Sequence, residues 1–461
     1  MEEEIVPTLP LPEAFLNFLN ENGLDSSIYS STTTNTTPRY IRVKPSEGEA
    51  HIPELEAEIN CKLDKVDWLP NFYSIPPHIQ IASTNSYRQG NVYGMDAVSG
   101  AAVLALNVVP GDHVLDLCAA PGAKLCMLAD LLGSSGSLTG VDIAKHRLAA
   151  CRTMLQKYSL SDHCRLFVAD GTSFSLVPLR KSTDTLLCED TMDTYKEWTS
   201  KRSWKERKRA QKERNGITSH LAACRTMLQK YSLSDHCRLF VADGTSFSLV
   251  PLRVSESGNK SLAFMFYTEI YGYTFVSNYQ RLVQIVPKSH EPELIFYGRQ
   301  SGVVGLSKRE ILQAASGNDL SDTGYDKVLV DAECTHDGSI KHIQKFDQWG
   351  WKTLQHGVLD AERTDTLANL HATSLQLLIN GFRLLKVGGM LVYSTCSLTV
   401  AQNEDIVEQF LSAHPSAELQ EIDAAKNWSC KSGKVPKTLR FDPLTSNTSG
   451  LFVASFTKLG V

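Results

Sequence analysis

The chain has 461 residues, of which 42% are hydrophobic and 21% are charged, and its formal net charge at pH 7 is −5. This length predicts two or three domains, and the composition is typical of a globular protein with an ample core. The net negative charge excludes a wholly basic nucleic-acid-binding protein, but it leaves room for a local basic groove. The eleven cysteines contain no Cys-x-x-Cys pair, so we expect reduced intracellular thiols, some of them catalytic.

The start of the chain, MEEEIVPTLP, is acidic and has no apolar run. A secretory signal needs an apolar core, and a mitochondrial presequence is rich in arginine and poor in acidic residues. No apolar run of the sequence reaches the roughly 18 residues of a membrane-spanning helix. We therefore expect the nucleus or cytoplasm, with no membrane partner. A monomer is expected as well.

Residues 1–85 are predicted to form a small α+β module. RYIRVK alternates like a strand, and HIPELEAEINCKL has the apolar spacing of a helix. A turn-rich segment, WLPNFYSIPPHI, follows them. The module therefore has its own strand–helix–strand order.

From residue 86 to residue 461, strands alternate with helices, which is typical of a parallel sheet covered by helices on both faces. The expected strands are DHVLDLC, GSLTGVD, HCRLFVADG, YDKVLVDAEC, GGMLVYSTCS and SGLFVASFTKL. The expected helices are KLCMLADLLG, which Gly133 would terminate, AKHRLAACRTMLQKYSL, and a long one around residues 364–385. This pattern predicts an α/β fold.

An irregular insert is expected at about residues 181–290, and it contains an identical copy, residues 221–253, of residues 148–180. In the first copy, 28 residues separate Asp142 from Asp170, which suits one helix and one strand of a right-handed crossover. The second copy has no preceding strand at that spacing, so we assign the sheet position to the first copy. A recent exon duplication or a gene-model error explains the second copy most simply, and a regulatory exchange between copies is the alternative.

Polar or reactive side chains follow the predicted strands at their carboxyl ends, where open α/β sheets bind ligands. They are Asp116 with Cys118, Asp142, Asp170, Asp331 with Cys334, and Cys396. The small residues of DLCAAPGAK let a ligand approach the backbone, and the amides of the next helix favour an anion. Asp142 is placed to bind ribose hydroxyls or to cap a helix, and Asp170 to bind an adenine amino group or to cap a turn.

The Gly-x-Gly-x-x-Gly fingerprint of dinucleotide cofactors is absent, which favours a nucleoside without pyrophosphate, such as S-adenosylmethionine. With these motifs, the sequence resembles the Sun/Fmu family of RNA cytosine C5-methyltransferases, which use S-adenosylmethionine. DLCAAPGAK is similar to the family's loop Cys-Ala-Ala-Pro-Gly-Gly-Lys, and YSTCS with QNED to its nucleophile segment. RYIRV, YGMDAVSG and GLFVASF also match. The resemblance implies a Rossmann-like methyltransferase domain with a mostly parallel, seven-stranded sheet.

The resemblance also implies a role for each matching residue, with no metal ion. The cofactor would contact the loop Cys118, Ala119, Ala120, Pro121, Gly122, Ala123 and Lys124, and also Asp142, Arg147, Asp170 and Asp331. Cys396 would be the nucleophile, Asp331 would contact the target base, and Cys334 would assist product release.

Two positions depart from the family. Ala123 replaces a glycine, which is a mild change if its φ is negative. Glu333 replaces a proline, and its carboxylate would raise the pKa of the nearby thiols or change how the substrate is read.

The implied reaction begins with addition of the Cys396 thiolate to C6 of cytosine, which makes C5 able to accept a methyl group. A protonated Asp331 would stabilise the charge that develops on the ring, and a base would then remove the C5 proton. The main alternative makes Cys334 the attacking thiol. A catalytically silent RNA-binding or ribosome-associated scaffold is the alternative function, and methylation of protein or small molecules is a weaker one.

The expected partner is tRNA, rRNA or mRNA. Phosphate contacts are expected from Arg39, Arg42 and Lys44 of the N-terminal module. The basic segment 196–214, with nine basic and three acidic residues, is a further candidate. Its alternatives are a solvated charged loop and a nuclear localisation signal.

Overall fold

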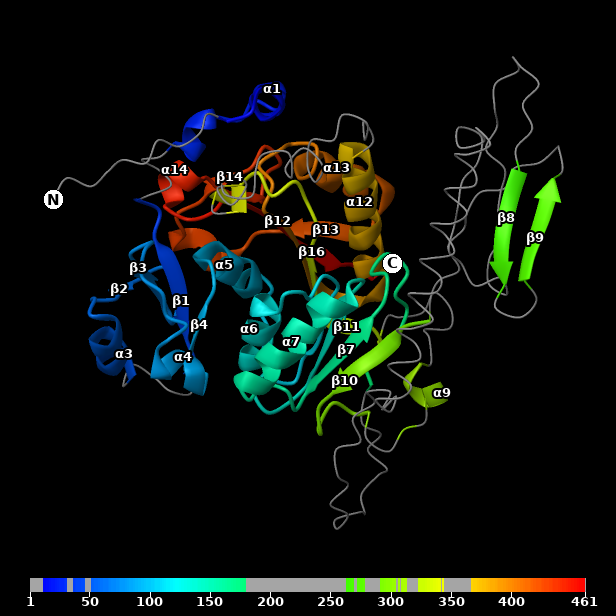
Figure 1. Ribbon diagram of the computed structural model, residues 1–461, viewed down its shortest axis with the longest axis horizontal. Coiled ribbons are helices and arrows are strands. Elements are labelled where there is room, and N and C mark those ends of the chain that lie inside the picture. Colours follow the sequence, from blue (N-terminus) through cyan, green and yellow to red (C-terminus); the bar gives the residue numbers. More distant parts are fainter. Residues whose placement is uncertain are drawn as a thin grey trace, which may run out of the picture. The chain divides into compact units, whose positions relative to one another are not determined.

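Figure 1 shows a computed structural model of the chain, which divides into two compact units, Met1–Lys196 with Pro292–Val461, and Glu197–Glu291. The structure describes residues 11–30, 36–45, 51–179, 263–268, 272–277, 291–303, 306, 308–312, 322–340, 342–343 and 366–460. In the second unit the described part is an antiparallel hairpin of β8 (Ala263–Thr268) and β9 (Gly272–Ser277). The second repeat copy and the basic segment 196–214 lie outside the described residues.

The N-terminal part of the first unit contains a four-stranded antiparallel sheet with the order β2-β3-β1-β4. Its elements are α1 (Glu13–Glu21), η1 (Ser26–Tyr29), β1 (Arg39–Val43), α3 (Ile52–Ile59), β2 (Asp64–Lys65), β3 (Phe72–Ile75), α4 (Asn85–Gln89) and β4 (Val92–Gly94). The strand–helix–strand order is the predicted one. The sheet continues to Gly94, beyond residue 85, and the boundary there stays a prediction.

The large sheet has ten strands among the described residues, in the order β10-β7-β6-β5-β11-β12-β16-β15-β14, with β13 also paired to β16. The strands are β5 (His113–Asp116), β6 (Ser137–Asp142), β7 (Cys164–Val168), β10 (Glu293–Tyr297), β11 (Tyr325–Asp331), β12 (Leu385–Thr395), β13 (Ala417–Gln420), β14 (Lys431–Ser432), β15 (Leu439–Phe441) and β16 (Leu451–Lys458). The five strands from β7 to β12 are parallel, and the flanking pairs are antiparallel.

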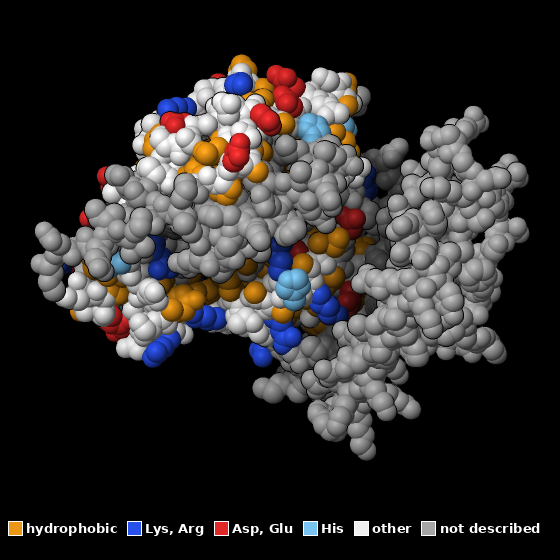
Figure 2. Space-filling view, turned by 45° about the horizontal axis from the view of Figure 1, so that its top comes forward, with side chains coloured by type: hydrophobic (Ala, Val, Ile, Leu, Met, Phe, Trp, Pro, Cys, Tyr) orange, Lys and Arg blue, Asp and Glu red, His pale blue; other side chains and the backbone are white. Residues whose placement is uncertain are grey.

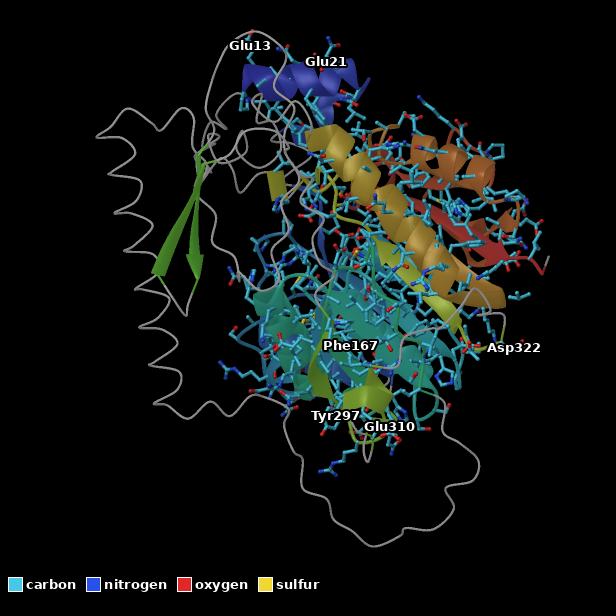
Figure 3. All side chains as sticks on the ribbon, turned by 90° about the vertical axis from the view of Figure 1, so that its right-hand side faces the viewer. Glu13, Glu21, Phe167, Tyr297, Glu310 and Asp322 are labelled. Carbon is cyan, nitrogen blue, oxygen red and sulfur yellow. The ribbon has the colours of Figure 1, made fainter. Side chains whose placement is uncertain are left out.

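The α/β fold with a parallel centre is confirmed, but the expectation of seven strands is wrong. Three short strands at the edges, β10, β14 and β15, add to the seven. Two to five residues long, they have too few positions for a clear alternating pattern, and they form by pairing with an existing edge. Figure 3 labels Phe167 of β7 and Tyr297 of its neighbour β10, which forms the edge of the sheet.

Helices cover both faces of the large sheet. They are α5 (Ala97–Ala105), α6 (Ala123–Leu132), α7 (Lys145–Lys157), α9 (Lys308–Ile311), α12 (Thr366–Leu384), α13 (Glu404–Ala413), η4 (Asp423–Asn427) and α14 (Pro443–Ser446). One hydrophobic cluster joins the sheet to α5, α6 and α7, and a second joins it to α12 and α13. Successive residues Val114 and Leu115 of β5 belong to different clusters, as expected for a strand with two buried faces. Figure 3 shows α12 lying across the sheet.

The first copy of the repeat supplies α7 and β7, and β7 pairs with β6 in parallel. The first copy therefore occupies the sheet position that was assigned to it. Within the part of the chain that the structure describes, no helix is both long and apolar enough to cross a membrane.

The three basic residues expected to bind RNA from the small sheet make contacts within the chain instead. Arg42 is 1% exposed and forms an ion pair with Asp130 of α6. Lys44 Nζ donates to the carbonyl of Tyr158 at 2.6 Å, and Arg39 donates to the carbonyl of Ile79 at 3.0 Å. The expected RNA contact is wrong for Arg42, because its alternating strand position faces the core between the two sheets rather than solvent.

Candidate functional site

Four parallel strands bring their carboxyl ends to one edge of the large sheet. Asp116 ends β5, Asp142 ends β6 and Asp331 ends β11, while Cys396 directly follows β12. In the register of β11 and β12, Asp331 lies opposite Ser394, two residues before Cys396. Residues far apart in the sequence are therefore brought together as the strand-end pattern predicts.

Asp331 is held by two hydrogen bonds in this cluster. Its Oδ2 accepts from Lys124 Nζ at 2.7 Å, and its Oδ1 accepts from Ser394 Oγ at 2.7 Å. Burial lowers the pKa of Lys124, but the carboxylate of Asp331 outweighs burial, and the net direction is upward.

The loop between β5 and α6 is fixed by contacts with β6 and α7. Asp142, 6% exposed, accepts from the amide of Ala120 at 3.2 Å and from the amide of Ala144 at 2.8 Å. Arg147 Nη2 donates to the carbonyl of Ala120 at 3.1 Å. Asp142 therefore braces the loop, and each of its oxygens keeps a lone pair for a further donor.

The glycine of this loop has a specific role. Gly122 has φ +113°, and a Cβ added there would lie 3.0 Å from Cα of Cys151. Both the backbone conformation and the close approach of α7 therefore require glycine. Ala123 is the first residue of α6, where the helical backbone has a negative φ, so its replacement of the family's glycine is tolerated.

Two acidic residues that the sequence placed at strand ends differ in their surroundings. Asp116 is 1% exposed, and burial together with the charge of Asp331 raises its pKa to about 7. Asp170 is exposed and accepts from the amide of Thr172 at 2.9 Å, which is the turn-capping alternative.

Burial raises the pKa of Cys118 well above its usual range, so this thiol stays protonated.

Cys334, Cys396 and His336 form a compact triad at the same edge. The sulfur atoms of Cys334 and Cys396 lie 3.2 Å apart. Nδ1 of His336 lies 2.9 Å from Sγ of Cys396 and 3.8 Å from Sγ of Cys334. Cys334 is 5% exposed, and Cys396 is more exposed. Sequence reasoning missed His336, although a histidine two residues after one candidate thiol was a usable signal.

Hydrogen bonds within the triad favour the thiolate form of Cys334. The hydrogen bond from Cys396, with a further one from His336, lowers the pKa of Cys334 to about 6. The same hydrogen bond and burial raise the pKa of Cys396. Hydrogen bonds to the Cys334 thiolate, rather than the carboxylate of Glu333, determine the direction of its pKa, and the expected effect of Glu333 stays a prediction.

Sulfur and imidazole are also donor atoms that Zn²⁺ prefers, and one such atom from each triad residue lies within 4.8 Å of the others. Two sulfurs on a tetrahedral zinc, each bonded at about 2.3 Å, would stand about 3.8 Å apart. The observed 3.2 Å between Cys334 and Cys396 is shorter. The arrangement therefore fits a hydrogen-bonded triad better than a zinc site.

The segment QNED explains how the two cysteine loops stay together. Gln402 is 1% exposed; its Oε1 accepts from the amide of Thr335 at 3.0 Å, and its Nε2 donates to Ser397 Oγ at 3.1 Å. Asn403 Nδ2 donates to the carbonyl of Ser397 at 2.9 Å. Gln402 therefore cross-links the residue that follows Cys334 with the one that follows Cys396, and Asn403 fixes the second of these.

Comparison with known families identifies one match. A family model described as 16S rRNA methyltransferase RsmB/F matches residues 103–194 and 303–457. These two ranges contain the strand ends, the loop after β5, and the triad.

Several curated proteins are similar over shorter stretches. The multisite-specific tRNA:(cytosine-C(5))-methyltransferase trm4b of Schizosaccharomyces pombe is 34% identical over 103 residues, 22% of this chain and 13% of that protein. The mitochondrial tRNA (cytosine(34)-C(5))-methyltransferase of Danio rerio is 33% identical over 102 residues, 22% of this chain and 24% of that protein. The 28S rRNA (cytosine-C(5))-methyltransferase of Mus musculus is 33% identical over 93 residues, 20% of each chain. The chain thus spans less than a quarter of each relative.

Two solved structures from Pyrococcus horikoshii share the fold. A methyltransferase homolog protein gives a TM-score of 0.51 at 18% identity, covering 97% of this chain and 100% of that one. NSun6, solved with SFG, gives a TM-score of 0.55 at 13% identity, covering 98% of this chain and 99% of that one. At these identities, the likeness supports the fold alone.

Proposed function

The chain belongs to the RsmB/F family of 16S rRNA methyltransferases, whose model matches more than half of it, and from this premise we propose that it is an RNA cytosine C5-methyltransferase. The substrate class that we propose is tRNA or rRNA, because the similar proteins act on these RNAs by name. The observation that carries the proposal is the pair of cysteines, 3.2 Å apart, beside Asp331 at the strand ends.

We propose S-adenosylmethionine as the cofactor, bound at the carboxyl ends of β5, β6 and β7. The donor set suits a nucleoside: Asp142 has lone pairs for ribose hydroxyls, and Gly122 keeps the loop free of a side chain. Lys124 and Asp331 lie on the side toward the thiols, and Arg147 braces the loop from α7. Asp170 is the proposed adenine contact, although its own turn already uses one of its oxygens. When bound, the cofactor supplies an electrophilic methyl group.

In the proposed reaction, the Cys396 thiolate adds to C6 of the cytosine, which makes C5 nucleophilic. Asp331, in its protonated form, then donates a hydrogen bond to the ring nitrogen N3 and stabilises the charge that develops there, while Lys124 lies 2.7 Å from its Oδ2. After methyl transfer a base removes the C5 proton, and Cys396 leaves with assistance from Cys334. The target base has to leave its stack to reach these groups.

The lowered pKa of Cys334 favours the alternative in which Cys334 is the attacking thiol. Exposure favours Cys396, because a nucleophile has to meet the base and Cys334 is only 5% exposed. RNA that contains 5-azacytosine traps the attacking thiol covalently. Trapping that survives Cys396→Ala but not Cys334→Ala would reverse the assignment.

RNA contact is proposed for the surface around the strand ends and for the segment 196–214. On the face shown in Figure 2, Lys and Arg side chains lie mostly in the lower half of the view, and Asp and Glu side chains are most frequent at the top. Such a separation of charge favours phosphate binding on one side. Deletion of residues 196–214 should flatten the salt dependence of RNA binding, and an unchanged slope would reject a phosphate role for this segment.

Two further expectations stay predictions. One relative is named as mitochondrial, so the predicted nucleus or cytoplasm is not decided by the comparisons. The predicted monomer likewise stays a prediction, and sedimentation of the purified chain would test it.

The deciding experiment measures methyl transfer from labelled S-adenosylmethionine to total cellular RNA. Wild type, Cys396→Ala and the control Cys61→Ala, which changes a thiol outside the site, are compared. We expect labelled 5-methylcytosine with wild type and Cys61→Ala only, and the labelled RNA fraction then identifies the substrate. No label with wild type, while S-adenosylmethionine still binds, would favour the catalytically silent RNA-binding scaffold.

A further inference from the structure

His336 is the residue of the triad to which the sequence motifs assign no role. Its Nδ1 lies 2.9 Å from Sγ of Cys396, which is hydrogen-bond distance for a thiol and an imidazole. At this distance, a neutral imidazole with its proton on Nε2 can accept the thiol proton of Cys396.

The backbone at His336 is held in an uncommon conformation. Its φ is +57°, in the left-handed region, which costs a non-glycine residue about 1 kcal/mol. Neighbouring contacts hold this conformation in place. The amide of Gly338 donates to the carbonyl of Cys396 at 2.9 Å, and the amide of Leu398 donates to Asp337 Oδ2 at 2.7 Å. Such a conformation, fixed from both sides next to a reactive thiol, is typical of a functional position.

The charges that face the triad increase the tendency of His336 to take up a proton. The hydrogen bond with Cys334 raises the pKa of His336 against the effect of burial, and the carboxylates of Glu333 and Asp331 raise it further. Glu333 stands where the family has proline, and its carboxylate stabilises the imidazolium that forms when His336 accepts a proton. Lys124 faces Cys396 from α6 and stabilises its thiolate as well.

We propose that His336 is a further catalytic residue, which takes the thiol proton of Cys396 during attack and returns it when the sulfur leaves. This proposal rests on the proposed function and deepens it. As the S–H bond of Cys396 breaks, an N–H bond forms at Nδ1, and the sulfur electron pair forms the bond to C6 of cytosine. When that bond breaks, the electron pair returns to sulfur, which regains the proton from the imidazolium.

Cys334 is the competing acceptor for this proton, since its sulfur lies 3.2 Å from that of Cys396. His336 is closer, at 2.9 Å, and it leaves Cys334 free to assist release. Measurement in a Cys334→Ala background separates the two acceptors, because only His336 remains to accept the proton.

The test uses the full chain and two readouts. In the Cys334→Ala background, the rate of Cys396 alkylation by iodoacetamide is followed against pH by mass spectrometry of its peptide. In chains with both cysteines, kcat/KM for RNA methylation is followed against pH. His336→Asn is the test variant, because asparagine tolerates a positive φ, and His342→Asn, at a ring 5.1 Å from that of His336, is the matched control.

We expect His336→Asn to move the midpoint of Cys396 alkylation upward by at least about one pH unit, which is about tenfold lower reactivity below the midpoint. Its kcat/KM at pH 7 should fall about 100-fold, the effect of losing a general base. The control His342→Asn should keep the wild-type profile. In His336→Gly, which also suits the positive φ, added imidazole should restore part of the lost rate, a recovery that a purely structural role would not give.

Unchanged alkylation and methylation profiles in His336→Asn would overturn the proposal. A lower rate with the wild-type alkylation midpoint and no recovery by imidazole would also overturn it, because His336 would then act through structure alone. If wild type methylates no RNA while the alkylation midpoint still depends on His336, the proposed function fails and the proton transfer between His336 and Cys396 stands.

Discussion

Gly338 offers a direct test of how closely the segment after Cys334 packs against Cys396. Its amide donates to the carbonyl of Cys396 at 2.9 Å, and its own carbonyl accepts from the amide of Gly450 at 2.7 Å. A Cβ added at Gly338 would lie 2.6 Å from the carbonyl oxygen of Cys396 and 3.0 Å from Cα of Gly450. All of these neighbours are backbone atoms, so no side-chain rotation can relieve the contact in Gly338→Ala.

The size of the effect follows from these distances. An ordinary carbon–oxygen contact needs about 3.4 Å, so the loops have to separate by about 0.8 Å. Overpacking of this kind costs about 1–3 kcal/mol of unfolding free energy. Because the displaced backbone carries Cys396 itself, we expect kcat/KM to fall about 100-fold, as for a misplacement of about 1 Å at a reacting group.

Gly94→Ala is the matched control, because a Cβ there meets no atom within 4 Å. Urea unfolding of both variants measures the stability change, and methylation of the RNA substrate measures the rate. We expect Gly94→Ala to stay within about 0.5 kcal/mol of wild type and to keep its activity. Gly338→Ala with wild-type stability and wild-type kcat/KM would refute the close packing of the two loops.

Three other substitutions test separate parts of the structure. The pKa of Asp116 is raised to about 7, so ionisation of its carboxyl group lowers the unfolding free energy progressively as pH rises from about 4 to 7. By urea unfolding, the Asp116→Asn variant should therefore be more stable than wild type by up to about 4 kcal/mol at pH 8 and by almost nothing at pH 4. An equal difference at both pH values would argue against the raised pKa. Gln402→Met should lower the unfolding free energy by about 3 kcal/mol, because the buried partners of the amide lose their hydrogen bonds, and it should also slow methylation. A stable and active variant would contradict the cross-link between the loops. Arg42→Met should lower the unfolding free energy by about 3–5 kcal/mol, because it leaves Asp130 buried and unpaired. The folded fraction should bind RNA with unchanged affinity. Weaker RNA binding at wild-type stability would instead support Arg42 as a phosphate contact.

The strand ends of the large sheet could be predicted from the sequence. Buried strands are continuous apolar runs, so the first polar residue after each run marks its end, as Asp142 and Asp331 do. In a parallel sheet these ends share one edge, and the clustering of the site follows without knowledge of any contact. The position of the first repeat copy could be predicted in the same way, from the length that a crossover needs.

The contacts between side chains could not be predicted in this way. Arg39 and Arg42 are three residues apart in RYIRV and so lie on opposite faces of β1, and nothing in this stretch shows that Arg42 faces α6, which carries Asp130. The approach of His336 to Cys396 depends on a left-handed backbone at a non-glycine residue, which no local pattern indicates. The short strands β14 and β15 were missed because they are extended only through pairing with neighbouring strands, and their own composition does not indicate a strand.

The N-terminal segment contributes to the same loop from outside the large sheet. Tyr29 donates its hydroxyl to the carbonyl of Asp337, the residue after His336. Burial raises the pKa of Tyr29, so the hydroxyl keeps its proton and stays a donor. Phe15, Phe18 and Ile28 surround it in a hydrophobic cluster that also includes Ile343. Because β11, β12 and this N-terminal cluster all fix the residues around His336, the loop has little freedom to adopt another conformation, and the triad is organised without any ligand.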